Sequence, residues 1–314
     1  VVKIAVWHNL PFGGAGRALY DHARGLVAAG HELEFFSRAG LETDRLPFRD
    51  LGRVHEVPLD YFDTEGTTPA QMMWNHYRRF KRMYPGFIAH AKESARMIDA
   101  GGFDLLFANT CEQFHTPQVG RFVTTVPKLL YLQDPFRWLY EPMPKLPIVP
   151  PGPDASIKAK VKDLIDLQDA RKRSRDELDS AMAYDKILVN SFFSREAVLR
   201  AFGLESEVCY LGIDLERFAP DYRPAGDYVF GFGTLGPQKG VMAVIDGLAE
   251  IPEPGRPRLV WSGNMVDPVY TALMEKRAAE KGVRFEVHRN LPDGEIRRLL
   301  TGAITLVYAS RLEP

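Results

Sequence analysis

Two segments, one at the start of the chain and one past its middle, show the same pattern of a short apolar run, a glycine-rich loop and a helical run. The first covers residues 2–29 with its loop at 8–16, and the second covers 228–249 with its loop at 233–240. Such apolar runs are typical of buried parallel strands. Glycines after them let backbone N–H groups and a helix N-terminus approach an anion or a sugar. The repeat predicts an α/β fold with two Rossmann-like doubly wound domains.

Apolar runs alternate with helical patterns along the whole chain, which favours parallel sheets with right-handed crossovers. We expect strands at residues 2–7, 31–36, 104–108, 128–132, 186–190, 228–232, 258–262, 284–288 and 304–308. The segment 218–227 is polar and rich in Pro and Gly, as linkers are. It predicts an N-terminal domain at 1–218 and a C-terminal domain at 219–314. Residues 158–175 form a charge-dense helical pattern, which we interpret as a solvated face.

Composition limits the class of protein. With 314 residues, 45% hydrophobic content and a net charge of −1, the chain is long enough for two domains with their own cores. The balanced charge does not call for a nucleic-acid partner. Cys111 and Cys209 alone support neither a disulfide framework nor a zinc cluster. No apolar stretch approaches the roughly 18 residues of a membrane span. From the two distant cysteines we expect a cytoplasmic protein without a metal site, and its association with a membrane stays open.

The second glycine loop admits two interpretations. Gly231, Gly233 and Gly236 have the spacing of a dinucleotide fingerprint, which would suit a nucleotide-dependent oxidoreductase. An acidic residue that binds a ribose would be expected about twenty residues further on, but residues 252–255 there form a Pro- and Gly-rich turn. Lys239 instead places a positive charge just before a helix, where it would meet a phosphate.

Four stretches occur in the order found in one known family: residues 8–14, residues 187–196 with 211–214 and Phe218, then Lys239-Gly240, and finally Glu313-Pro314. Together they resemble a retaining glycosyltransferase of the GT-B fold, in glycosyltransferase family 4. The resemblance implies a nucleotide diphosphate sugar as donor, held mostly by the C-terminal domain. It also implies a saccharide or lipid-linked acceptor held mostly by the N-terminal domain, and metal-independent transfer without a cofactor.

The same resemblance assigns the donor-binding residues. They are expected to be Gly233, Thr234, Lys239, Gly263 and Asn264. Lys239 matches the basic residue that contacts the diphosphate in the family. Thr234 stands where the family commonly has an arginine, and a lysine cannot duplicate a bidentate arginine contact. Either another residue, such as Arg17, supplies that charge, or the diphosphate binds less tightly.

Glu313 matches the first of two family glutamates that are separated by seven residues, and the first one meets the sugar. The chain ends before a second glutamate could occur. The resemblance therefore predicts that the C-terminal domain is incomplete at its C-terminus.

Candidates in the N-terminal domain lie after its strands. Gln133 and Asp134 stand where many family members have a histidine near the reacting sugar, so either could hydrogen-bond a hydroxyl and Asp134 could act as a base. Asp134 could equally begin a turn before Pro135. His115 follows another strand, where open α/β sheets bind ligands, although it could be structural. The first glycine loop offers further acceptor or sugar contacts at Gly13, Gly14 and Arg17, or it is only a tight connection.

Residues 72–84 mix bulky apolar side chains with four cations at helical spacing. This segment could lie on an anionic membrane surface beside a lipid-linked acceptor, or its apolar residues could pack on the domain. A non-catalytic sugar-nucleotide or glycan binding protein of the same fold remains an alternative to an enzyme, because the arginine and histidine of the family are both replaced.

Overall fold

The computed structural model describes residues 1–41, 44–60, 69–141, 146, 148–216, 218–219, 226–264 and 267–310, with the backbone alone for 69–82. The chain divides into two compact units, Val1–Gly212 and Ile213–Glu313. We call them the N-terminal and C-terminal units. Most of the expected linker, at 220–225, lies outside the described residues.

The N-terminal unit is built on a parallel sheet of seven strands in the order β3-β2-β1-β4-β5-β6-β7. The strands are β1 (Lys3–Asn9), β2 (Glu32–Arg38), β3 (Arg53–Val57), β4 (Leu105–Cys111), β5 (Lys128–Tyr131), β6 (Lys186–Val189) and β7 (Glu207–Val208). The five predicted strands are all present, and β3 and β7 were missed. The strand order reverses at β1, which lies between β2 and β4, and open parallel sheets bind ligands at the carboxyl ends of strands beside such a reversal.

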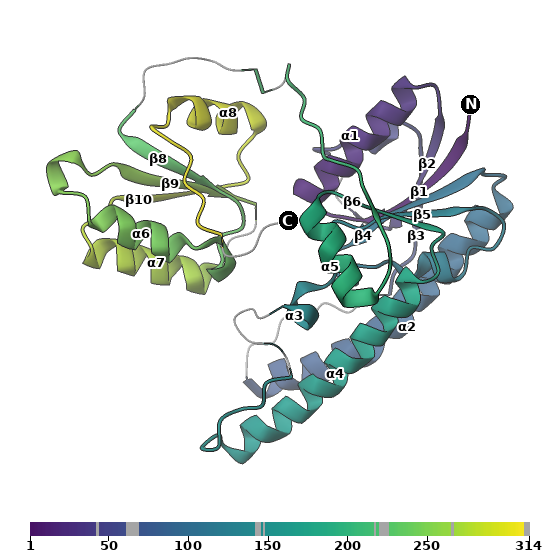
Figure 1. Ribbon diagram of the computed structural model, residues 1–314, viewed down its shortest axis with the longest axis horizontal. Helices are drawn as coiled ribbons and strands as arrows, with labels where there is room; N and C mark the ends of the chain where they lie inside the picture. The colour runs from purple at the N-terminus through teal and green to yellow at the C-terminus, as the bar shows by residue number, and fades with distance from the viewer. Residues whose placement is uncertain are drawn as a thin grey trace. The chain divides into compact units, whose positions relative to one another are not determined.

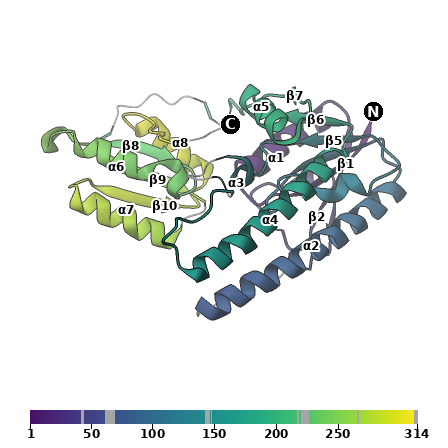
Figure 2. The same cartoon turned by 60° about the horizontal axis from the view of Figure 1, so that its bottom comes forward.

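Helices cover both faces of this sheet (Figure 1). They are α1 (Gly14–Ala28), α2 (Pro69–Ala100), α3 (Arg137–Tyr140), α4 (Ile157–Ala181) and α5 (Phe192–Phe202), with short 3-10 helices η1 (Phe48–Asp50) and η2 (Gln118–Arg121). Serine caps begin two of them, since Ser156 accepts a hydrogen bond from the backbone of Ala159 in α4, and Ser191 accepts one from Ser194 in α5. The long helices α2 and α4 extend side by side beyond the sheet in both views (Figure 2).

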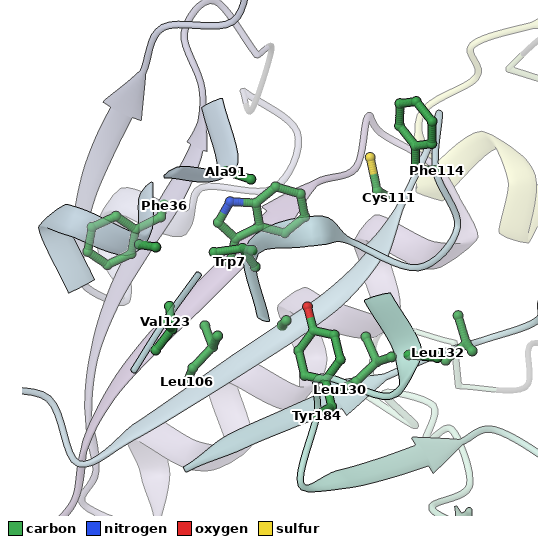
Figure 3. Packing of buried hydrophobic residues seen from close by; sticks show 14 of the residues in the cluster. Trp7, Phe36, Ala91, Leu106, Cys111, Phe114, Val123, Leu130, Leu132 and Tyr184 are labelled. Carbon is green, nitrogen blue, oxygen red and sulfur yellow. The ribbon is translucent and has the colours of Figure 1, made fainter. Parts of the chain in front are cut away.

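The alternation of side chains along β1 creates two cores. Ala5 and Trp7 point to the face covered by α2 and the end of α4, whereas Ile4 and Val6 point to the face covered by α1. Figure 3 shows the indole of Trp7 among buried side chains of the first core, and Trp7 Nε1 donates a hydrogen bond to Ser94 Oγ at 3.2 Å. A sheet buried on both faces explains why its strands read as continuous apolar runs.

The C-terminal unit has a smaller parallel sheet in the order β10-β9-β8. Its elements are β8 (Tyr228–Phe232), η3 (Pro237–Lys239), α6 (Val241–Ala249), η4 (Glu253–Gly255), β9 (Arg258–Gly263), α7 (Pro268–Glu280), β10 (Phe285–Arg289) and α8 (Asp293–Gly302). Helices α6 and α7 pack on one face of the sheet and α8 on the other (Figure 1). The prediction of an α/β fold with two doubly wound parts is confirmed.

The prediction of a strand over residues 304–308 is wrong, because the segment does not form a regular strand. The segment runs along β8, with Ile304 N donating to Tyr228 O at 2.9 Å and Val307 N donating to Phe230 O at 2.8 Å. Only one bridge, between Phe230 and Leu306, has regular parallel geometry. Val307 packs against the core under α6 and α7, but Ile304 and Leu306 are each 52% exposed. One face of the segment therefore lacks the packing that would hold a longer ladder in place.

Candidate functional site

The loop after β8 is fixed by a glycine and by the neighbouring strand. Gly233 has φ 128°, a conformation that favours glycine. Its N–H donates to Ser262 O at 2.8 Å, and its carbonyl accepts a hydrogen bond from Trp261 Nε1 at 2.9 Å. Two contacts to β9 therefore hold the backbone of Gly233, and Thr234 follows it as a half-buried residue.

Lys239 lies at the end of this loop, just before α6. Its Nζ donates to Tyr308 Oη at 3.1 Å and lies 5.4 Å from the centre of the Tyr308 ring. Gly240 follows with φ 66° and begins α6, and a Cβ at Gly240 would lie only 2.0 Å from Ala309 O. The glycine therefore lets the segment that carries Tyr308 pack against the loop.

The ends of β9 and β10 complete this edge of the sheet. Gly263 is buried at the end of β9, and Asn264 follows it half-buried. Asn290, with φ 51°, follows β10 and donates its backbone N–H to Gly263 O at 3.2 Å. Because parallel strands end at the same edge, these residues lie on the side of the C-terminal sheet that carries Lys239.

All described donor-binding candidates thus lie at one edge of the C-terminal sheet, together with Tyr308 and Asn290, which sequence reasoning did not single out. Residues 241–244 form the first turn of α6 and include no acidic side chain. The positive end of the helix dipole and the ammonium of Lys239 favour an anion here. Glu313 lies outside the described residues.

In the N-terminal unit, the end of the β1–α1 loop and the first turn of α1 contain glycines of two kinds. A Cβ at Gly16 in α1 would lie 2.7 Å from the backbone oxygen of Pro11 in the preceding loop, so that glycine is needed for packing. At Gly13 and Gly14 no heavy atom of the described residues lies within 4 Å of such a Cβ. The guanidinium of Arg17 lies 5.6 Å from the centre of the Phe12 ring. Gly13 and Gly14 therefore leave room for a ligand beside the start of α1.

His115 and Asp134 meet where β4 and β5 end. His115 Nδ1 lies 3.2 Å from the backbone oxygen of Asp134 and 3.4 Å from its Oδ1, and the two side chains are 22% and 20% exposed. A carbonyl oxygen only accepts, so Nδ1 carries the proton in this bond. Burial lowers the pKa of His115, but the hydrogen bond and charge of Asp134 outweigh it, and the pKa lies above its ordinary value.

Gln133 is held beside this pair by its backbone. Its N–H donates to Thr110 Oγ1 at 3.0 Å, and that hydroxyl donates in turn to Tyr131 O at 3.3 Å. The three predicted residues Gln133, Asp134 and His115 are therefore neighbours on loops that follow adjacent strands, β4 and β5.

The end of α4 contributes two residues that sequence reasoning missed. Glu177 is fully buried and accepts a hydrogen bond from the backbone N–H of Phe136 at 3.2 Å, and burial raises its pKa to about 7. Arg173 lies with its guanidinium 4.0 Å from the centre of the Phe136 ring. The prediction that 158–175 is a solvated face is therefore wrong at Arg173, because the last turns of α4 pack under the loop of Asp134.

Other expectations concern metals and membranes. Among the described residues, no group of three or more His, Cys, Asp or Glu side chains is placed to hold a metal ion. None of the helices in the described part of the chain is long and apolar enough to cross a membrane.

Cys111 and Cys209 are free thiols. The backbone of 72–84 is helical within α2, but most of its side chains lie outside the described residues.

Solved structures share this architecture at low sequence identity. HepE from Anabaena, in complex with UDP and glucose, is 15% identical with a TM-score of 0.66, over 99% of this chain and 74% of that one. WaaG, a glycosyltransferase involved in lipopolysaccharide biosynthesis, is 16% identical with a TM-score of 0.57, over 100% and 76%. Trehalose 6-phosphate synthase from Burkholderia multivorans is 13% identical with a TM-score of 0.59, over 98% and 76%. No family model and no curated protein matches the sequence. The fold is that of the GT-B glycosyltransferases.

Proposed function

We propose that the chain is a retaining, metal-independent glycosyltransferase of family 4 that moves a sugar from a nucleotide diphosphate sugar to a hydroxyl of a glycan or lipid-linked acceptor. The observation that carries the proposal is the edge of the C-terminal sheet, where Lys239, the Gly233 turn and the start of α6 lie together. Structures of the similar protein HepE contain UDP and UDP-glucose, which supports a nucleotide sugar as the donor.

The chemistry of this edge suits a departing diphosphate. Negative charge develops on the diphosphate as its bond to the sugar breaks, and a fixed cation with helix N-terminal amides stabilises that charge. Tyr308 fixes the ammonium of Lys239 by a hydrogen bond. Thr234 adds a hydroxyl, and Gly263 and Asn264 bring backbone groups to the same edge. In a retaining route of the internal-return type, the departing phosphate itself takes the proton of the acceptor hydroxyl.

The acceptor side of the proposal rests on the loops after β4 and β5. Nδ1 of His115 is engaged by Asp134, so Nε2 is the ring atom that can contact a sugar or acceptor oxygen. When the imidazole is protonated, Nε2 donates, and Asp134 holds the ring. Gln133 on the same loop is a further candidate for a hydroxyl contact, and Gly13, Gly14 and Arg17 are candidates in the β1–α1 loop.

An oxidoreductase is the weaker alternative. Nicotinamide-binding Rossmann domains place an acidic residue at the end of the strand after the glycine loop, where it binds the ribose. In this chain that strand is β9, and it ends at Gly263 followed by Asn264. A binding protein without turnover shares every feature of the donor edge and differs only in activity. Membrane contact through 72–84 and a cytoplasmic location remain proposals.

Turnover separates these functions. The chain would be incubated with UDP-, GDP- and ADP-sugars and a panel of saccharide acceptors, in the presence and absence of EDTA, and products would be followed by NMR. The proposal expects a product with the anomeric configuration of the donor, unaffected by EDTA. An inverted product overturns retention, and loss of activity in EDTA overturns metal independence. Nucleotide-sugar binding without any product favours the binding protein.

A further inference from the structure

Three segments of the N-terminal unit converge on one buried carboxylate, that of Glu177 in α4. Its Oε2 accepts the N–H of Phe136, in the loop that carries Asp134. Among the described residues none hydrogen-bonds Oε1 with ordinary geometry, although the N–H of Thr116 is near enough to favour the charged form. The side chain is 0% exposed. Burying a charged carboxylate costs free energy unless neighbouring groups compensate its charge. The groups around Glu177 therefore show how that charge is stabilised.

Helix α4 contacts both loops that carry the His115–Asp134 pair. Arg173, one turn before Glu177, donates to the backbone oxygen of Gln113 and covers one side of the Phe136 ring at 4.0 Å. The ring of His115 meets Phe136 edge-on, with centres 5.0 Å apart. Phe136 thus contacts a cation and an imidazole while its backbone is bonded to Glu177. A displacement of α4 would therefore move the loops of both His115 and Asp134, and a change in its charge would alter the electrostatics of both side chains.

Charged and titratable groups near Glu177 come from α2, α3, α4 and the loop after β4. Arg173 on α4 and His115 on the β4 loop favour its charged form, and Asp134 contacts Nδ1 of His115. The charge of Glu177 also acts on Tyr140 of α3 and Tyr84 of α2, and burial raises the pKa of both phenols, so they stay neutral near pH 7. His115 is therefore the neighbour whose protonation responds to Glu177 in the neutral range.

We propose that Glu177 is a positioning residue for the His115–Asp134 pair: its buried carboxyl group holds the loop of Asp134 in place, and once ionised its negative charge favours the protonated form of His115. The protonated ring donates through Nδ1 to Asp134 and through Nε2 to a sugar or acceptor oxygen. The contact of His115 with a sugar or acceptor oxygen rests on the proposed function. The effect of Glu177 on the protonation of His115 rests on the N-terminal unit alone.

The test replaces Glu177 by glutamine, which keeps an oxygen for the N–H of Phe136 but removes the charge. Asp179→Asn is the matched control, because Asp179 is on the same helix and exposed. The titration of His115 is followed by NMR and assigned with His115→Asn. In Glu177→Gln the midpoint falls by on the order of one pH unit, the low end of what a nearby opposite charge produces, and Asp179→Asn leaves it unchanged. An unchanged midpoint in Glu177→Gln overturns the proposal.

Two further measurements keep the proposal falsifiable. If Glu177→Gln does not fold, the carboxyl carbon of Glu177 and the ring of His115 are titrated in the unaltered chain, and they must share an inflection; independent curves overturn the proposal. In the transfer assay, the pH profile of kcat shifts with the NMR midpoint while the KM of the donor stays constant. A shifted midpoint with an unmoved profile overturns the contact of His115 with a sugar or acceptor oxygen. An inactive unaltered chain overturns the proposed function instead, and the NMR result then decides the effect of Glu177 on the protonation of His115.

Discussion

Lys239 and Tyr308 are 69 residues apart in the sequence, and the ammonium of the lysine donates a hydrogen bond of 3.1 Å to the phenol oxygen of the tyrosine. The bond joins the loop after β8 to the segment that runs along the edge of the same sheet. It fixes a positive charge beside the N-terminus of α6, where helix amides also favour an anion. This relationship makes the C-terminal unit a candidate for phosphate binding.

Replacing Lys239 by alanine should weaken binding of a nucleotide diphosphate about 10- to 100-fold, because a hydrogen bond to a charged group contributes about 1.5–3 kcal/mol. Tyr308→Phe should cost less than about tenfold, since it removes only the group that orients the lysine. Titration calorimetry measures both. Lys276→Ala, at an exposed position on α7, is the control, and an equal loss in that variant would contradict a specific role of Lys239.

Gly240→Ala should destabilise the C-terminal unit by about 1–3 kcal/mol, because the residue has φ 66° and its Cβ would lie 2.0 Å from Ala309 O. Gly247→Ala in the same helix is the matched control. No heavy atom of the described chain lies within 4 Å of a Cβ there, so that variant should gain about 0.5–1 kcal/mol. Urea unfolding would show the two effects, and a stable Gly240→Ala chain would contradict the close approach.

Glu177 should make the chain less stable as the pH rises. Burial raises its pKa from the ordinary 4.5 to about 7, so between these values the folded state binds more protons than the unfolded state, and unfolding becomes easier with increasing pH. Glu177→Gln should therefore gain stability relative to the unaltered chain between pH 4.5 and 7, by a total on the order of 3 kcal/mol. Urea unfolding at several pH values measures this difference in the free energy of unfolding. A difference that stays constant with pH would show that burial does not raise the pKa of Glu177.

His8 should make the chain less stable as the pH falls, which is the opposite pH dependence to that of Glu177. It is buried in β1 with its ring 4.8 Å from that of Phe48, and burial lowers its pKa from 6.5 to about 4. The unfolded state then binds more protons between these values, so stability is lost as the pH falls below 6.5, by up to about 3 kcal/mol. His8→Gln should remove this acid sensitivity. His288→Gln, at a more exposed position, should retain it; the same pH slope in His8→Gln and in the unaltered chain would refute the assignment.

Elements with continuous apolar sequences and glycine boundaries were predictable. Strand β8 and helix α6 occupy the ranges expected from the sequence, 228–232 and 241–249. Strand β3 was missed because three of the five residues of Arg53–Val57 are polar or charged, so it has no apolar run, and β7 was missed because it has two residues. The run at 304–308 was overpredicted because an apolar composition does not show that a segment lies at a sheet edge.

The positions of the candidate residues were predictable where a motif lies next to a strand end. Lys239, Gly233 and His115 could be found in this way, since parallel strands bring their carboxyl ends together. Glu177 could not, because α4 has the composition of a solvated helix and only the tertiary packing places its last turns under Phe136. The roles of Glu313 and of residues 72–84, and the retaining mechanism, stay predictions.

We expect the C-terminal unit to bind a nucleotide diphosphate sugar. The most direct measurement is a calorimetric titration of the chain with UDP, GDP, ADP, their sugars, NAD and NADP, repeated with Lys239→Ala. We expect that one nucleotide diphosphate and its sugar bind, that Lys239→Ala weakens both, and that NAD and NADP do not bind. Binding of NAD or NADP alone, unaffected by Lys239→Ala, would contradict this expectation.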